Sequence, residues 1–209
     1  MKTQNSFRQI LLAAGVALAV LLMPATSQAV TLTKANTTTL NASADWNAGA
    51  GPAPTSADLL TWQSSPITAA NNIALTLGGD ISCLSLDLRP NGTADPSLKI
   101  GSGNILNLGS NGANQSKGAW DTMFNCTINL IGNVALNIQG SMIINGSITQ
   151  SGGNWALNKN SSSGALHLTA ANSYGGGQVQ RTRAAVLVQC PGAAALRNAA
   201  INNHAPLDV

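Results

Sequence analysis

The side chains best suited to acid–base chemistry are few and scattered along this chain. It contains seven aspartates and no glutamate. The aspartates are Asp45, Asp58, Asp80, Asp87, Asp95, Asp121 and Asp208. Hydrolysis of a glycosidic bond needs two carboxyl groups about 5 to 10 Å apart. Asp80, Asp87 and Asp95 come nearest to such a set, provided that stacked strands bring them together, but they lie in segments with Gly, Pro or Asn, where Asp bonds the local backbone. We therefore expect turn residues rather than catalytic acids.

The two histidines have no recognisable catalytic partner. His167 lies between Leu166 and Leu168, so strand alternation directs its side chain to the face opposite the two leucines. His204 lies in a polar stretch near the end. Neither has a serine or cysteine at a spacing that indicates nucleophilic catalysis. We expect no catalytic residue.

The three cysteines, Cys83, Cys126 and Cys190, are far apart and lack the C-x-x-C spacing of zinc sites. No calcium-binding repeat and no phosphate-binding glycine loop follows a strand. We therefore expect no metal and no cofactor. In an exported protein a Cys83–Cys126 disulfide is one alternative, and thiols buried among strands are the other.

Residues 1–29 have the layout of a secretory signal peptide. Lys2 and Arg8 precede an apolar run over residues 10–23, which is shorter than a membrane span. Small residues before and at Ala29 predict cleavage after that position, with an uncleaved anchor as the alternative. We expect an exported protein, extracellular or at the outer cell surface or else periplasmic, that contacts a membrane only through this segment.

The charge balance excludes nucleic acid as a partner. The formal net charge is +3, and the signal carries two basic residues and no acid, so the remainder carries 3 − 2 = +1. With 8% charged residues, the chain cannot present the dense basic surface that phosphate backbones require.

The sequence after residue 29 is typical of one all-β domain. Short runs of alternating apolar residues recur after residue 72, as in Leu84, Leu86 and Leu88, with Asn-Gly pairs such as those at 111–112 and 145–146 that fit turns with positive φ. With aromatic residues at only 3%, the core is expected to be thin and made of Ile, Leu and Val. The pattern favours a single-stranded right-handed parallel β-helix (solenoid), with a β-sandwich as the alternative. Its Asn- and Thr-rich surface is expected to form side-chain ladders.

Segment 30–72 differs from the rest and predicts an irregular N-terminal cap or lead-in before solenoid repeats over 73–209. It has little alternation but contains Trp46 and Trp62, whose large apolar rings indicate packing rather than a linker. A cap is expected because an open solenoid end exposes unpaired strand edges.

Several phrases resemble the autotransporter-associated β-strand repeat proteins. Residues 161–177 resemble the repeat phrase G-x-L-x-L-x-x-x-N-x-Y-x-G-G, and 31–41, 51–72 and 101–109 resemble other parts of the family. The matching positions of the repeat phrase are Gly164, Leu166, Leu168, Asn172, Tyr174, Gly176 and Gly177. The chain departs from the family pattern at Arg181 and Arg183, where uncharged residues are expected, and ends in what reads as the middle of a repeat.

The resemblance implies a passenger-type surface or secreted module that is structural and adhesive rather than enzymatic. Its implied partners are surface glycans or other surface proteins, and a second copy could associate through the open solenoid end. The alternative is a carbohydrate-binding or polysaccharide-degrading β-helix, and a third reading is a truncated product without an independent role.

Overall fold

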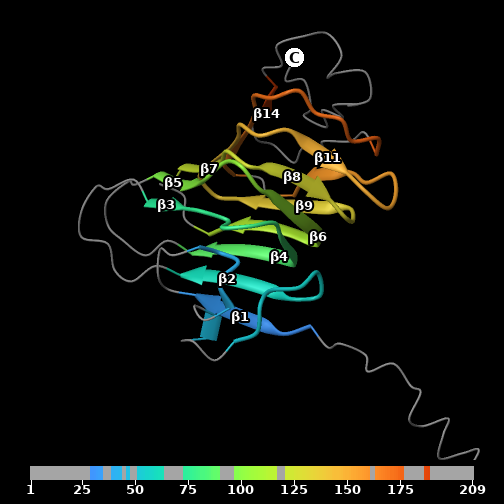
Figure 1. Ribbon diagram of the computed structural model, residues 1–209. Coiled ribbons are helices and arrows are strands. Elements are labelled where there is room, and N and C mark those ends of the chain that lie inside the picture. Colours follow the sequence, from blue (N-terminus) through green and yellow to red (C-terminus); the bar gives the residue numbers. More distant parts are fainter. Residues whose placement is uncertain are drawn as a thin grey trace, which may run out of the picture.

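The computed structural model (Figure 1) describes residues 29–34, 39–43, 46–47, 51–63, 73–89, 97–116, 121–160, 163–176 and 186–188. The regular elements of this part are all β-strands. They are β1 (Thr31–Lys34), β2 (Leu59–Gln63), β3 (Ile73–Leu75), β4 (Ile81–Arg89), β5 (Ser97–Ile100), β6 (Ile105–Gln115), β7 (Asp121–Phe124), β8 (Thr127–Leu130), β9 (Val134–Ile138), β10 (Ser141–Ile144), β11 (Ile148–Gln150), β12 (Leu157–Lys159), β13 (Ala165–Leu168) and β14 (Val186–Val188). No helix among the described residues is long and apolar enough to cross a membrane.

The strands wind into a parallel β-solenoid of about four turns. Every strand pair in the described part is parallel, and each strand lies beside one from the next turn, as β4 does beside β6 and β6 beside β8. Hydrogen-bonded side chains on neighbouring turns are typically 20 to 28 residues apart in sequence. The predicted solenoid is confirmed. The sandwich alternative is wrong, because its sheets would be antiparallel.

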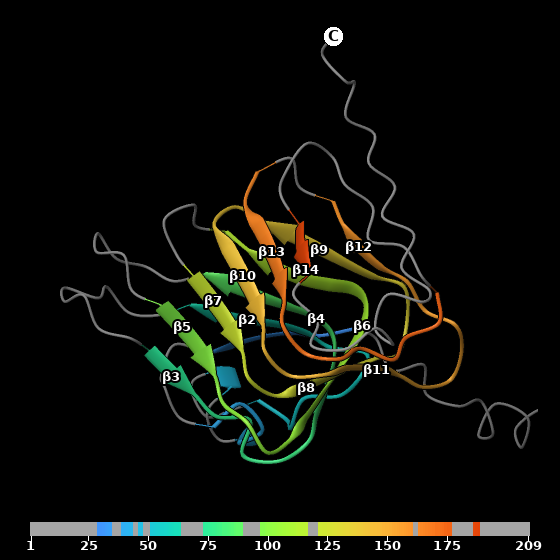
Figure 2. The same cartoon turned by 90° about the horizontal axis from the view of Figure 1, so that it is seen from above.

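Seen along its axis, the coil has three faces (Figure 2). The first face is the sheet in the order β14-β13-β10-β7-β5-β3. The second face holds β8, β11 and the first halves of β4 and β6. The third face holds β1, β2, β9, β12 and the second halves of β4 and β6. Three short strands per turn explain why each apolar run in the sequence has only two or three inward residues.

A corner inside β4 and β6 joins the second face to the third. The register shifts between Cys83, which pairs with Leu108, and Ser85, which pairs with Gly112. Gly112 has a φ of 69°, and a Cβ there would collide with the backbone of Ala135 on the next turn. Asn111-Gly112 is therefore a bend within one strand, not the turn between strands that we expected, although its positive φ is confirmed.

The glycine of Asn145-Gly146 serves another purpose. Gly146 has no positive φ, contrary to expectation. A Cβ at this position would run into the carbonyl group of Cys126 one turn below. The glycine is needed because stacked turns approach closely, as main chains about 4.8 Å apart do in a sheet.

Inward side chains of successive turns stack into a narrow apolar core. One column on the third face runs through Leu32, Leu60, Leu86, Ala113 and Leu136, all at most 1% exposed. The alternation read from the sequence therefore identifies the core within each strand.

In β4 the alternation breaks at the corner. Leu84 was expected to share a face with Leu86 and Leu88, but it is only half-buried whereas the other two are buried. Leu84 and Ser85 lie at the register shift in β4, where two consecutive residues point outward.

The described residues of segment 30–72 lie at the N-terminal end of the coil and contribute two strands to the ladder. β1 and β2 continue the third face in register with β4, so parallel pairing begins before residue 73. Trp62 points inward from β2, and Trp46 lies in an irregular stretch with its indole Nε1 donating to the Leu40 carbonyl at 2.8 Å. Both tryptophans are 0% exposed. Their predicted packing is confirmed.

Several predictions fall on residues that the structure does not describe. They concern the signal peptide over 1–28 and the end of the chain after 188. The individual residues are Asp45, Asp95, Asp208, His204, Cys190, Arg181 and Arg183.

Candidate functional site

Two of the candidate acids hold the backbone in place. Asp58 is 4% exposed, and its carboxylate accepts hydrogen bonds from the amide of Val30 and from the amide and hydroxyl of Thr55 at 2.7 to 3.3 Å. Asp80 accepts from the Ile105 amide of the next turn at 2.8 Å. Their role at turns is as expected, because a carboxylate beside free amide groups satisfies donors that no strand pairs.

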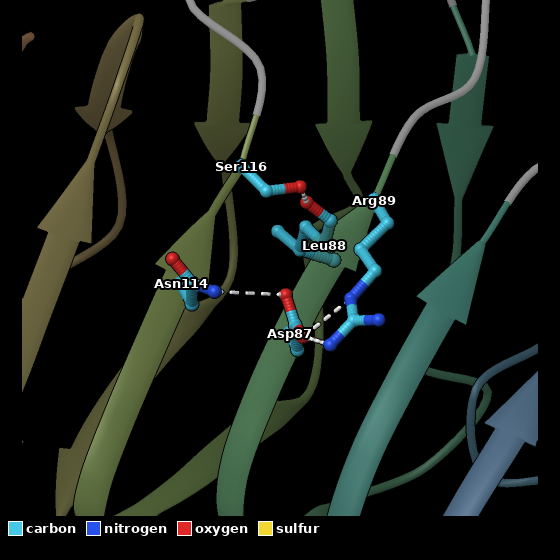
Figure 3. Close-up of polar contacts among 5 residues, drawn as sticks. All are labelled: Asp87, Leu88, Arg89, Asn114 and Ser116. Carbon is cyan, nitrogen blue, oxygen red and sulfur yellow. Dashed lines mark hydrogen bonds and ion pairs between the residues drawn. The ribbon is translucent and has the colours of Figure 1, made fainter.

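Asp87 is the exception, because it lies within β4 on the outer surface of the third face. Figure 3 shows its carboxylate between Asn114 and Arg89. The Asn114 amide donates to it at 3.1 Å, and the Arg89 guanidinium donates through Nε at 2.6 Å. Ser116, the outward neighbour of Asn114, donates to the carbonyl of Leu88 at 3.4 Å. The expectation that Asp87 is a turn residue is wrong.

Asp87 and Arg89 form an ion pair without net charge that presents hydrogen-bonding groups at the surface. The Asp87 side chain is 16% exposed and the Arg89 side chain 55%. The hydrogen bond to Asp87, and then its negative charge, raise the pKa of Arg89. Opposite charges two residues apart on one face of a strand are a signal that the sequence carried and that our reading missed. The pair can hydrogen-bond a polar ligand, but it offers no second carboxylate.

The candidate acids are not brought together. Asp80 precedes β4 and Asp87 lies near its far end, with the corner between them. Asp95 lies outside the described residues. Within the described part, no group of three His, Cys, Asp or Glu side chains could hold a metal ion.

The second face carries a ladder of outward polar side chains, one per turn. It comprises Ser82, Asn107, Asn129 and Thr149, which are register partners on β4, β6, β8 and β11. The Asn107 amide donates to Ser82 Oγ at 3.1 Å, the Asn129 amide to Asn107 Oδ1 at 2.8 Å, and the Thr149 hydroxyl to Asn129 Oδ1 at 3.3 Å. The expected side-chain ladder is therefore present.

A second ladder follows the corner between the first and second faces. The Asn145 amide donates to Asn125 Oδ1 at 2.9 Å, and the Thr169 hydroxyl donates to Asn145 Oδ1 at 2.8 Å. Such ladders satisfy the polar side chains of each turn with those of its neighbours. The outer surface is thus polar and preorganised by bonds between turns.

The thiols that the structure describes are buried and unbridged. Burial raises the pKa of Cys83 to about 12, with the charge of Asp58 adding to the effect, and burial raises the pKa of Cys126 to about 11. Cys126 immediately precedes β8, which is separated from β4 by β6. Two turns put their levels roughly 9 to 10 Å apart, beyond the Cα separation of about 4 to 7 Å that a disulfide spans. The buried-thiol alternative is confirmed for these two.

His167 points outward from β13 and is half-buried, between the buried Leu166 and Leu168, as alternation predicted. The sequence analysis missed four polar side chains of the strands that point inward instead. They are Lys34, Gln115, Thr122 and Lys159, each at most 2% exposed. No local signal distinguishes them, because alternation places a residue on a face without regard to its polarity.

The residues that carry the family resemblance have structural roles here. Gly164 has a φ of 71° before β13. Asn172 Oδ1 accepts from the Ile148 amide of the turn below at 2.8 Å, and Tyr174 packs against the core. Gly176 lies so close to the backbone of Trp155 that no Cβ would fit. The residues of the repeat phrase therefore fix how one turn of the coil packs and bonds against the turn before it.

Comparison with known proteins finds no matching family model, no matching curated protein and no matching solved structure. The fold itself defines the class of protein, a parallel β-solenoid with polar outer ladders.

Proposed function

We propose that this chain is an exported, non-catalytic structural and adhesive module, similar in type to autotransporter-associated β-strand repeat proteins. The observation that carries the proposal is the outer surface of the solenoid. Its polar side chains are bonded from turn to turn, as in the ladder of Asn107 and Asn129. A surface fixed in this way loses little side-chain entropy when it binds a ligand.

Three of the described carboxylates, those of Asp58, Asp80 and Asp87, support a non-catalytic role. Asp58 and Asp80 are engaged by backbone amides, and Asp87 by Arg89 and Asn114. An acid–base mechanism needs a second group within reach of the same bond. These three carboxylates instead each bond a residue of a neighbouring turn.

The binding partners that fit this surface are surface glycans or other surface proteins. Amide and hydroxyl groups at regular spacing along an extended face suit repeated hydrogen-bonding ligands, and solenoids commonly bind along such faces. The apolar segment before Ala29 supports export, which would place the module where these partners occur.

Polysaccharide binding or degradation is the second candidate function, and the Asp87 cluster favours it. A carboxylate, a guanidinium and an amide lie side by side on the third face (Figure 3). These groups can hydrogen-bond sugar hydroxyls in several directions. A single carboxylate supports binding better than hydrolysis.

The first test expresses the chain from residue 1 in a secreting bacterium and locates it by fractionation. We expect a product outside the cytoplasm with a mass that corresponds to cleavage after Ala29. The matched control is Ala17→Arg, which places a charge in the apolar run and should retain the protein in the cytoplasm. A wild-type product found only in the cytoplasm would refute the export part of the proposal.

The second test measures binding of the exported protein to immobilised bacterial polysaccharides and to whole cells, with release of reducing sugar followed in parallel. Asn129→Ala, Asn114→Ala and His167→Ala alter the second, third and first faces in turn. Binding that one variant weakens severalfold, with no sugar released, is the expected result. Absence of binding would refute adhesion, and release of sugar would favour the degradative alternative.

A further inference from the structure

β1 is the outermost strand of the third face at the N-terminal end of the coil (Figure 1). The Leu59 amide of β2 donates to the Val30 carbonyl at 2.9 Å. Since alternate residues of a parallel strand bond to opposite sides, Leu32 faces β2, whereas Thr31 and Thr33 direct their backbone groups to the outer edge. Such an edge is a template for a strand from another chain.

Asn47 covers part of this edge. Its Oδ1 accepts from the Thr33 backbone amide at 2.9 Å and from the Thr33 hydroxyl at 3.1 Å. Asn47 has a φ of 49°, and it is the one residue other than glycine with a positive φ in the described part of the chain. Asparagine and aspartate tolerate this left-handed conformation better than other side chains. The left-handed conformation of Asn47 thus holds its Oδ1 against the Thr33 amide. An added strand would need that amide for pairing.

Lys34 places a buried charge at the end of the same strand. Its side chain points inward at the end of β1 and is 2% exposed. The ammonium lies 5.8 Å from the centre of the Trp46 ring, which stabilises a cation. Inward-pointing charges are among the features that disfavour further pairing at sheet edges.

We propose that the third-face edge at the N-terminal end of the solenoid is closed, because Asn47 and Lys34 prevent β1 from pairing with a strand of a second copy. The bonded amide of Thr33 is the structural observation that carries this inference. Association of this protein, where it occurs, then uses another edge, the other end or a face. The inference does not depend on what the outer faces bind.

The test compares two substitutions of Asn47 in the exported protein. Asn47→Gly removes the acceptor but keeps the left-handed backbone conformation accessible. Asn47→Asp is the matched control, because a carboxylate oxygen can accept the same hydrogen bond and aspartate tolerates the same φ. Light scattering after size-exclusion chromatography gives the mass of each variant over a range of concentrations, and circular dichroism checks that each is folded.

Asn47→Gly is expected to show a mass that rises with concentration to about twice that of the wild type, as one added copy requires. Asn47→Asp should match the wild type. A folded Asn47→Gly variant with the wild-type mass at every concentration would overturn the proposal.

Hydrogen exchange on the wild type tests the bond between Asn47 and the Thr33 amide without any substitution. The amide of Thr33 should exchange at least about tenfold more slowly than that of Thr31, which shares the edge but not the bond to Asn47. Equal exchange rates at the two amides would also overturn the proposal, and this result would stand even if Asn47→Gly failed to fold.

Discussion

Thr122 offers a sharp test of how the core is built. It points inward from β7 between Leu98 of the turn below and Met142 of the turn above. The side chain is 0% exposed, and its hydroxyl has no hydrogen-bond partner. We predict that Thr122→Val stabilises the protein, because valine has nearly the same shape and removes the buried hydroxyl.

The magnitude follows from the cost of an unsatisfied polar group. Leaving a buried hydroxyl without a partner costs about 1 to 3 kcal/mol. Valine keeps the β-branched shape that suits a strand, so we expect a gain of about 1 kcal/mol in the free energy of unfolding. For a chain of this size that gain corresponds to a rise of roughly 2 to 4 °C in the melting temperature.

The assay is urea unfolding of the purified protein followed by circular dichroism, with the m-value checked for constancy. The matched control is Thr149→Val on the outer ladder, where the hydroxyl donates to Asn129 Oδ1. That substitution should lose about 0.5 to 1 kcal/mol. If Thr122→Val were no more stable than the wild type, the reasoning that its hydroxyl is an uncompensated cost would be refuted.

Two further predictions concern the thiols and the stacking of turns. Cys83 and Cys126, with their pKa raised to about 12 and about 11, stay protonated in the folded state when the unfolded thiols ionise. The stabilisation from keeping the two thiols protonated is therefore present below about pH 9 and is lost as the pH rises. For the two thiols together, the free energy of unfolding falls by roughly 2 to 3 kcal/mol between pH 8 and pH 10. The double alanine variant should lack this part of the decline in urea midpoints, and an equal decline in both proteins would contradict the assignment. Gly146→Ala should cost more than about 2 kcal/mol in the same assay, because its Cβ meets the Cys126 carbonyl. Gly152→Asn, in open space, should cost less than about 1 kcal/mol, and similar losses in the two glycine variants would show that close stacking is not the cause.

Much of the fold could be predicted from the sequence because a solenoid is built from local patterns. Alternation identified Leu86 and Leu88 as inward residues of one strand, and the scarcity of aromatic side chains pointed to a thin core. The failure at Leu84 has a physical cause. It lies at a corner where the register shifts between neighbouring turns, and alternation read along one strand contains no information about the strand beside it.

The candidate site was less accessible to sequence reasoning. The analysis placed Asp87 at a turn, whereas it lies on an outer face with Arg89, two residues away, and Asn114 of the next turn. The bond to Asn114 crosses 27 residues, and the ladder bond from Asn129 to Asn107 crosses 22. Because the number of residues per turn varies along the coil, no fixed period in the sequence identifies such partners.

The sequence by itself determined the class of structure and, away from the corners, the inward and outward faces within each strand. These depend on hydrophobicity, side-chain alternation and local turn chemistry, which act over a few residues. Tertiary structure decided which polar groups meet, why Gly146 must be glycine, and how Asn47 reaches Thr33. Those outcomes depend on how one turn aligns with the next, which is set by the packing of the whole coil.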